Sequence, residues 1–421
     1  MNTVAAPVAF GWQAGWRYGL PGFALAFVAL PLYVVLPNYY VRSFGVSLAA
    51  LGTLLLLARL ADAFVDPLLG RLSDRLYARS LQAVLGWGAG AAALLVGGFT
   101  LLFFPPVSAM APLLAWAGAC LLITYIGYSL LGILHQSWGA MLGGDEAQRS
   151  RIVAWREGLG LAGVLVASTA PALLGMGGTS LLLGAALVLG VWAWSHAPRP
   201  TPALQAEVAG ALWQPFHRPG FRPLLAVFMV NGIASAIPAT LILFFVQDRL
   251  QAPAAMEPLF LGSYFLCAAL AIPLWLRLVQ GIGLARSWLV GMVLSISVFL
   301  ATATLGTGDA IAFVVVCALS GVALGTDLIL PGALLAGTIA ANGDRGRADG
   351  AYFGWWNFAT KLNLALSAGV ALPVLGWLGY TPGTREESSL QTLTLAYCLL
   401  PCVLKALAAG LLYFLIIRKP S

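Results

Sequence analysis

Long apolar stretches separated by short polar connections run through the whole chain of 421 residues. A helix that spans a bilayer needs about 20 mostly apolar residues. Windows of that length predict twelve such helices, at 18–41, 48–69, 81–104, 110–142, 153–174, 178–196, 222–246, 256–278, 287–306, 310–338, 351–379 and 391–417. The pattern therefore predicts an all-α membrane protein with both ends on the same side of the membrane.

One connection is longer and more polar than the rest. Residues 197–221 are rich in proline, and the stretch 203–216 within them is compatible with a short helix lying on the membrane surface. This connection predicts a division into an N-terminal six-helix half (1–196), a central loop (197–221) and a C-terminal six-helix half (222–421). Two such halves are the arrangement of transporters built from parallel repeats, in which the substrate site lies between the halves near the midplane.

Composition and charge narrow the class further. The chain is 60% hydrophobic and only 9% charged, whereas a soluble domain carries roughly 25% charged residues. Its net charge of +7 does not indicate a nucleic-acid partner, because most basic residues fall in the connections of one side, and only Arg42, Arg249 and Arg385 lie on the other. Since basic loops stay inside, we expect both termini and the central loop in the cytoplasm of a bacterium, and a monomeric multi-pass protein of the inner membrane.

Three ionisable residues interrupt the second apolar segment. Arg59, Asp62 and Asp66 occupy positions i, i+3 and i+7, which share one face of an α-helix. A charge at bilayer depth costs about 2.5–3.5 kcal/mol on insertion scales, so such residues are by default sites for an ion, a proton or a substrate. Two carboxyl groups one turn apart can share a proton or a cation. The alternative is a static charge network with Arg59 that only fixes helix packing.

Other polar residues inside predicted spans are further candidates for a substrate or coupling network. His135 can contact substrate or relay a proton, or it can be a hydrogen-bonded interior residue. Arg156 is expected to face the cavity, and its neighbour Glu157, about 100° around the helix, is not expected to pair with it. Lys361 can pair with the carboxyl groups of the second span, or it can reach the interface. Asp327 can take part in function, or it can simply pair with a lysine or an arginine across the cavity.

Two residues have plainer alternatives. Trp356 can stack on a sugar ring or a hydrocarbon chain, but aromatic residues near helix ends are commonly interfacial anchors. Lys405 is interpreted as a lysine that reaches the interface or serves structure. The chain has no phosphate-binding loop and no HExxH or GxSxG motif, so we expect neither an enzyme nor a cofactor other than a coupling ion.

A loop after the second span carries a recognisable motif. The run Gly70-Arg71-Leu72-Ser73-Asp74-Arg75 resembles the G-x-L-x-D-R motif of the major facilitator superfamily. The resemblance implies a gating role for Gly70, Asp74 and Arg75, in which the glycine permits close helix approach and Asp74 can pair with arginines of the loop.

A narrower resemblance covers most of the chain. The helix-2 charges, Tyr18-Gly19, the region from Trp138 to Glu157, and the segments from Leu330 and from Arg347 to Lys361 resemble the glycoside–pentoside–hexuronide:cation symporters in order and spacing. The resemblance implies that Asp62 and Asp66 bind the coupling cation. It also implies that Arg59, Arg156 and Lys361 line the same cavity.

The chain also departs from that family's pattern. Ala26 and His135 stand where two aspartates contact sugar in family members, and Val65 and Gly132 stand where an asparagine and a threonine complete a sodium site. Loss of these oxygen ligands favours protons over sodium, although both remain open.

The sequence therefore predicts a transporter that couples H⁺ or Na⁺ to the movement of a small solute, a sugar or a glycoside, by alternating access. Because the residues aligned with the family's sugar contacts differ, a lysolipid or another amphiphile is an alternative substrate. A membrane receptor or assembly factor that transports nothing is an alternative of another class.

Overall fold

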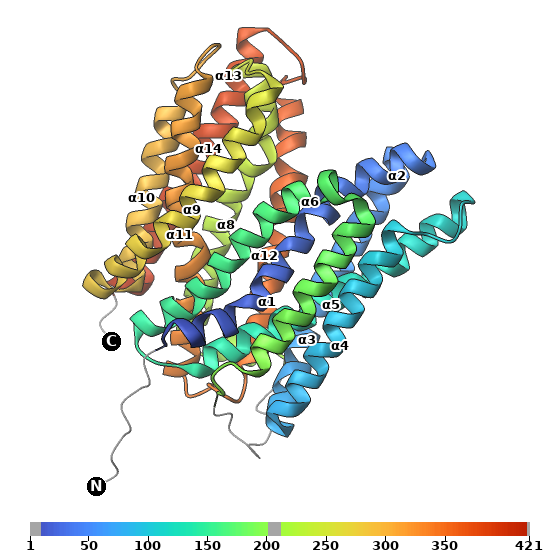
Figure 1. Ribbon diagram of the computed structural model, residues 1–421. Coiled ribbons are helices and arrows are strands. Elements are labelled where there is room, and N and C mark those ends of the chain that lie inside the picture. The colour runs from blue at the N-terminus through green and yellow to red at the C-terminus, as the bar shows by residue number, and fades with distance from the viewer. Residues whose placement is uncertain (1–9, 201–211, 419–421) are drawn as a thin grey trace. The chain divides into compact units, whose positions relative to one another are not determined.

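The structure is a computed structural model that describes residues 10–200 and 212–418, and this part of the chain is helical without strands. The chain forms two compact units, of which the first contains Met1–His217 and Ala336–Phe358 and the second Arg218–Leu335 and Ala359–Ser421. Figure 1 shows the helices in order along the chain. The division at 197–221 into halves stays a prediction.

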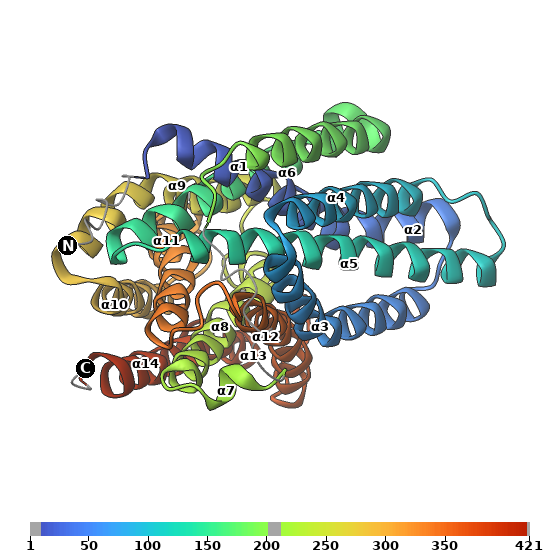
Figure 2. The ribbon, with the colours of Figure 1, turned by 90° about the horizontal axis from the view of Figure 1, so that it is seen from below.

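The first unit contains the helices of the N-terminal part of the chain and the adjoining ends of α11 and α12. The helices before residue 218 are α1 (Trp12–Leu30), η1 (Pro31–Val35), α2 (Leu36–Phe44), α3 (Leu48–Arg79), α4 (Leu81–Phe103), α5 (Met110–Leu142), α6 (Glu146–Ser195) and α7 (Gln214–His217). Helix α1 packs along α6, and α4 lies beside α5 (Figure 2). The surface helix predicted over 203–216 falls mainly outside the described residues, which resume at 212.

The second unit contains the remaining helices. They are α8 (Phe221–Phe244), η2 (Phe245–Arg249), η3 (Ala254–Met256), α9 (Glu257–Ile282), α10 (Leu284–Thr302), most of α11 (Ala310–Ala341), most of α12 (Asp349–Trp377), α13 (Glu387–Thr394), η4 (Leu395–Leu399), α14 (Leu400–Leu412) and η5 (Tyr413–Ile417). A buried aromatic cluster anchors one end of this unit, where the rings of Phe245 and Tyr397 stack with centroids 4.3 Å apart.

Nine helical segments among the described residues are long and apolar enough to cross a membrane. One of them, α6, holds the two spans predicted at 153–174 and 178–196, which meet at Gly175 with φ of 65°. Only glycine adopts this left-handed conformation at little cost. The two long helices α3 and α12 are not among the nine, so the count of twelve spans stays a prediction.

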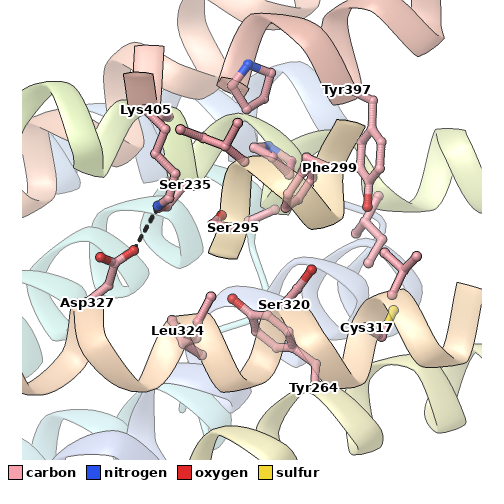
Figure 3. A pocket seen from close by; sticks show the side chains of 18 of the residues that line it. Ser235, Tyr264, Ser295, Phe299, Cys317, Ser320, Leu324, Asp327, Tyr397 and Lys405 are labelled. Carbon is pink, nitrogen blue, oxygen red and sulfur yellow. Dashed lines mark hydrogen bonds and ion pairs between the residues drawn. The ribbon is translucent and has the colours of Figure 1, made fainter. Parts of the chain in front are cut away.

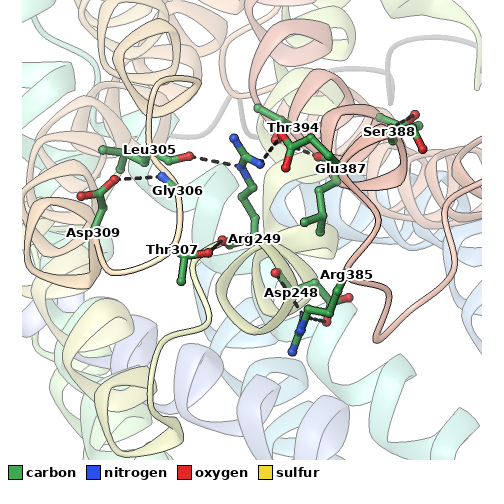
Figure 4. Close-up of polar contacts among 12 residues, drawn as sticks. Asp248, Arg249, Leu305, Gly306, Thr307, Asp309, Arg385, Glu387, Ser388 and Thr394 are labelled. Atoms are coloured by element: carbon green, nitrogen blue, oxygen red, sulfur yellow. Dashed lines mark hydrogen bonds and ion pairs between the residues drawn. The ribbon is translucent and has the colours of Figure 1, made fainter.

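Polar contacts tie together the connections at one end of the second unit (Figure 4). Arg249 donates from Nη1 to Glu387 Oε1 at 2.9 Å and from Nε to the carbonyl of Leu305 at 3.3 Å. Asp248 accepts the Tyr380 hydroxyl at 2.5 Å and lies 3.4 Å from Arg385. Two of the three arginines of the sparsely basic side thus hold loops to helix ends.

Candidate functional site

The charged face predicted on the second span lies on α3, in the first unit. Ser47 starts this helix by accepting a hydrogen bond from the backbone N–H of Ala50. The Asp62 residue is 7% exposed and Asp66 is fully buried, although both lie in an apolar sequence. The hydroxyl of Ser129, on α5, donates to Asp62 Oδ1 at 2.9 Å. The helix pair α3–α5 therefore holds two carboxyl groups and a hydroxyl away from solvent.

Arg59 lies on the same helix but is exposed. Its guanidinium carbon is 4.3 Å from the ring centroid of Tyr33, in η1. A cation over an aromatic face is attracted by the ring quadrupole. The contact holds Arg59 beside the first helix, two turns before Asp66.

Asp74 makes contacts that the sequence did not predict. Its two carboxylate oxygens accept the backbone N–H groups of Gly350 and Ala351, at 2.7 and 3.0 Å, where α12 begins. The first N–H groups of a helix have no partner within it and carry a partial positive charge, so a carboxylate binds well there. Asp74 therefore binds the start of α12 through these two hydrogen bonds, and its pairing with arginines of the loop stays a prediction.

Gly70 lets α3 and α12 come into backbone contact. A Cβ atom at Gly70 would lie 2.2 Å from the carbonyl oxygen of Gly350, and one at Gly354 would lie 2.7 Å from that of Asp66. The predicted close approach of helices at Gly70 is therefore present. Arg75, the third residue of the motif, is exposed.

Asp349 is the second acid at this junction, at the start of α12 and beyond the predicted spans. Burial raises its pKa to about 7, an effect that its hydrogen bond from Gly346 N–H partly opposes. Burial, together with the nearby charge of Asp349, also raises the pKa of Asp74 well above its usual value. The junction thus holds two carboxyl groups that resist being charged together.

Helices α1 and α6 pack through glycines. A Cβ atom at Gly19 or Gly22 would lie 2.6 or 2.5 Å from the backbone oxygens of Trp155 and Arg156. Small residues let helix backbones approach closely in this way. The approach fixes Arg156, whose side chain is only 15% exposed.

Arg156 and Glu157 form an ion pair, contrary to the expectation for adjacent residues. Arg156 Nη2 lies 2.6 Å from Glu157 Oε1, and Nε donates to the same oxygen at 2.8 Å. The angle of about 100° between adjacent positions separates their Cβ atoms. It does not separate the ends of long side chains, so the prediction was wrong about this pair.

His135 is fully buried in the wall between α1, α5 and α6. Its Nε2 lies 2.6 Å from the carbonyl oxygen of Tyr18, and its ring stacks on the Tyr18 ring with centroids 4.4 Å apart. Trp194 packs edge-on against the same imidazole. These contacts are consistent with His135 as a hydrogen-bonded interior residue. A role for His135 in transport stays a prediction.

The aromatic residues at the start of α12 divide between two roles. Trp356 is buried, with 6% of its surface exposed. Its neighbour Trp355 donates from Nε1 to the carbonyl of Leu212 at 2.8 Å and packs on Trp213 with ring centroids 4.6 Å apart. Trp355 therefore holds residues 212 and 213 of the central connection, and a substrate role for Trp356 stays a prediction.

Asp327 lies in the second unit and forms an ion pair, as one of its two interpretations expected, with Lys405 as a partner that the sequence did not single out. Lys405 Nζ is 2.9 Å from Asp327 Oδ2, and the two side chains are 7% and 16% exposed. Asn231 and Trp288 donate to Oδ1 at 3.0 and 2.8 Å, and Ser235 donates to Oδ2 at 3.2 Å. The one sequence feature that could have indicated this pair is that both residues, of opposite charge, lie in predicted apolar spans of the C-terminal half.

The structure thus separates the predicted site residues into two groups. The first unit contains Arg59, Asp62, Asp66, Gly70, Asp74, Arg75, His135, Arg156 and Trp356, and the second contains Asp327 and Lys361. A pairing of Lys361 with the carboxyl groups of α3 stays a prediction. Within residues 10–200 and 212–418, no group of three or more His, Cys, Asp or Glu side chains could hold a metal ion.

Comparison with known proteins agrees with a transporter. The chain is 30% identical over 156 residues to the "Putative glycoside/cation symporter YagG" of Escherichia coli (strain K12), a match that spans 36% of this chain and 33% of that relative's length. It is 24% identical to the "Uncharacterized symporter YjmB" of Bacillus subtilis (strain 168), over 94% of this chain and 90% of that one.

Solved structures show the same fold. A bacterial homologue of the iron transporter ferroportin, in an outward-facing state, matches with a TM-score of 0.71 and 16% identity, over 94% of this chain and 98% of the other. The major facilitator superfamily transporter FucP, in the outward conformation, matches with a TM-score of 0.64 and 13% identity, over 94% and 99%. The model of the family described as MFS/sugar transport protein matches residues 17–419. The chain therefore belongs to this family of the major facilitator superfamily, and it is a multi-pass membrane transporter and not an enzyme.

Proposed function

We propose that the chain is a secondary transporter that couples the downhill movement of H⁺ or Na⁺ to the movement of a small solute, a sugar or a glycoside. Burial of Asp62 and Asp66 one turn apart on α3 carries the proposal. Carboxyl groups buried within an apolar helix are costly, so their retention indicates a site for a cation or a proton. The names of the two symporter relatives support ion coupling.

Ser129 bears on which ion is coupled. The residues aligned with the family's sodium ligands, Val65 and Gly132, supply no side-chain oxygen, which favours protons. Ser129 adds a hydroxyl oxygen beside Asp62 from the same helix as Gly132. Sodium binds oxygen ligands as other hard cations do. Because of this hydroxyl group, both H⁺ and Na⁺ are candidates for the coupling ion, and uptake under separate pH and sodium gradients distinguishes them.

We infer that the protein lies in the bacterial inner membrane with both termini and the central connection in the cytoplasm, because basic residues are concentrated in the connections of that side. We propose that it acts as a monomer. Residues 70–75 and the start of α12 then form a cytoplasmic gate. Arg156, Trp356 and Lys361 are the candidates for contacts with the solute.

Vesicle uptake tests the proposal. A panel of labelled sugars and glycosides is added outside proteoliposomes under a pH gradient alone, a sodium gradient alone, and neither. Asp62→Asn and Asp66→Asn should abolish accumulation driven by the gradient, while Asp309→Asn, an exposed acid of a loop in the second unit, should leave it intact. Accumulation equal to that of the unmodified protein in either α3 variant would refute the cation site.

A further inference from the structure

The second unit contains a cavity of its own, about 180 Å³ in volume, among α8, α9, α10, α11, η4 and α14. Its walls are mainly aliphatic and aromatic. Aromatic rings come from Tyr264, Phe265, Phe299 and Tyr397. All its lining residues belong to the second unit, whereas the proposed cation site lies on α3 in the first. The cavity is therefore a separate feature.

One end of the cavity is polar but carries no net charge. Figure 3 shows Asp327 and Lys405 joined at this end, with Tyr397 and Cys317 at the other. The carboxylate of Asp327 already accepts four hydrogen bonds, from Asn231, Trp288, Ser235 and Lys405. A further cation would find this carboxylate neutralised, and an anion would have to compete with it for Lys405. The end therefore favours an uncharged polar group.

Lys405 and Ser320 offer hydrogen bonds to such a group. An ammonium group has three N–H donors, and Lys405 uses one toward Asp327 and one toward Ser235. On the α11 wall, the buried Ser320 hydroxyl has no hydrogen-bond partner among the described residues. A buried polar atom without a partner is destabilising, so a ligand that bonds to it gains affinity. Figure 3 shows Ser320 between Leu324 and Cys317, along the cavity.

Volume and polarity together limit the ligand. An apolar cavity of roughly 150 Å³ engineered in another protein accommodates benzene, so about 180 Å³ accommodates one six-membered ring with a small substituent. A sugar ring of that size would bury several hydroxyl groups against apolar walls, and each one left unpaired would lower its affinity. A ring with a single hydroxyl group needs only the hydrogen bonds that Lys405 and Ser320 offer.

We propose that this cavity is a second binding site, for an uncharged molecule with one six-membered apolar ring and one hydroxyl group. The ring lies among Tyr264, Phe299 and Tyr397, and the hydroxyl accepts from Lys405 or bonds to Ser320. The site is independent of the coupling cation and of the transported solute.

Binding is measured on the purified full-length protein in detergent, with benzyl alcohol as the probe. Benzoate, benzylamine and glucose serve as probes that differ in charge or polarity. The expected result is saturable binding of benzyl alcohol that raises the unfolding temperature, since a ligand that binds only the folded state stabilises it. The other three probes should bind at least about tenfold more weakly.

Variants separate the cavity from detergent, into which benzyl alcohol also partitions. Ser320→Phe fills the cavity and should weaken binding about tenfold or more, whereas Ser297→Phe, on the exposed face of α10, should not change it. If Ser320→Phe does not fold, Ala323→Leu narrows the same wall. Absence of saturable binding, equal binding of glucose or of the charged probes, or unchanged binding in the filled variant would each overturn the proposal. None of these results depends on uptake by the transporter.

Discussion

Removal of the Lys405 ammonium should destabilise the protein far more than removal of an exposed charge. In Lys405→Met, Asp327 would lose its main counter-charge in a site where its side chain is only 16% exposed. Breaking a buried ion pair by removing one partner costs about 3–5 kcal/mol. Because Asp327 keeps some exposure and three other donors, the lower end, about 3 kcal/mol, applies.

Neutralising both partners should restore most of that loss. In the double variant Asp327→Asn with Lys405→Met, the new amide oxygen still accepts from Asn231 and Trp288, and its NH₂ can donate to Ser235. Replacing a buried ion pair by groups without charge is often neutral, so we expect a net cost of about 1 kcal/mol.

Unfolding in mixed micelles of increasing denaturing detergent measures these free energies. Arg277→Met, an exposed residue of α9, is the matched control for loss of a positive charge. The reasoning fails if Lys405→Met is no less stable than Arg277→Met, or if the double variant is less stable than Lys405→Met alone.

Three further predictions concern the first unit. Gly70→Ala should destabilise the junction with α12 by about 1–3 kcal/mol, because its Cβ meets a backbone oxygen at 2.2 Å, whereas Gly86→Ala, with open space around it, should not; thermal unfolding compares the two. Burial raises the pKa of Asp349 to about 7, so the folded protein binds more protons than the unfolded chain above the ordinary value of 3.8, and stability should fall as the pH rises through 7. Asp349→Asn should reduce this loss of stability between pH 5 and 8. The reduction should be partial, because the pKa of Asp74 is raised as well. An unchanged dependence of stability on pH would contradict the raised pKa of Asp349. Ser129→Ala removes the hydroxyl beside Asp62 and should raise the cation concentration for half-maximal uptake about tenfold, and an unaltered requirement would exclude Ser129 from the site.

Hydropathy was enough to predict an all-helical membrane protein, because a span must be apolar over a fixed length whatever it packs against. It also predicted a break at 175–177, and the structure has Gly175 with φ of 65° there. The same reasoning could not predict the pair Asp327–Lys405, whose residues are 78 positions apart, because their meeting depends on how α11 and α14 are rotated. The rotation of α11 relative to α14 could not be predicted from the single sequence.

The contacts of Asp74 illustrate a different limit. Its partners are backbone N–H groups, which every residue except proline possesses. The residue types at positions 350 and 351 therefore could not identify them as the partners of Asp74. The family resemblance indicated that Gly70 and Asp74 matter, and it suggested arginines of the loop, not these amides, as partners of Asp74. The ion pair of Arg156 and Glu157 shows a further limit. To predict which charged side chains of a helix can meet, side-chain length must be considered together with the angle between their positions around the helix.

The hydrogen bonds of Asp74 also constrain the order in which the protein can be made. Its two partners follow it by 276 and 277 residues, and the first unit includes Ala336–Phe358 from late in the chain. During synthesis, the helix that carries Asp74 therefore enters the membrane long before the amides that bind it exist. The first unit is completed only when almost the whole polypeptide has left the ribosome, so a fragment that ends in the central connection would lack part of its own fold.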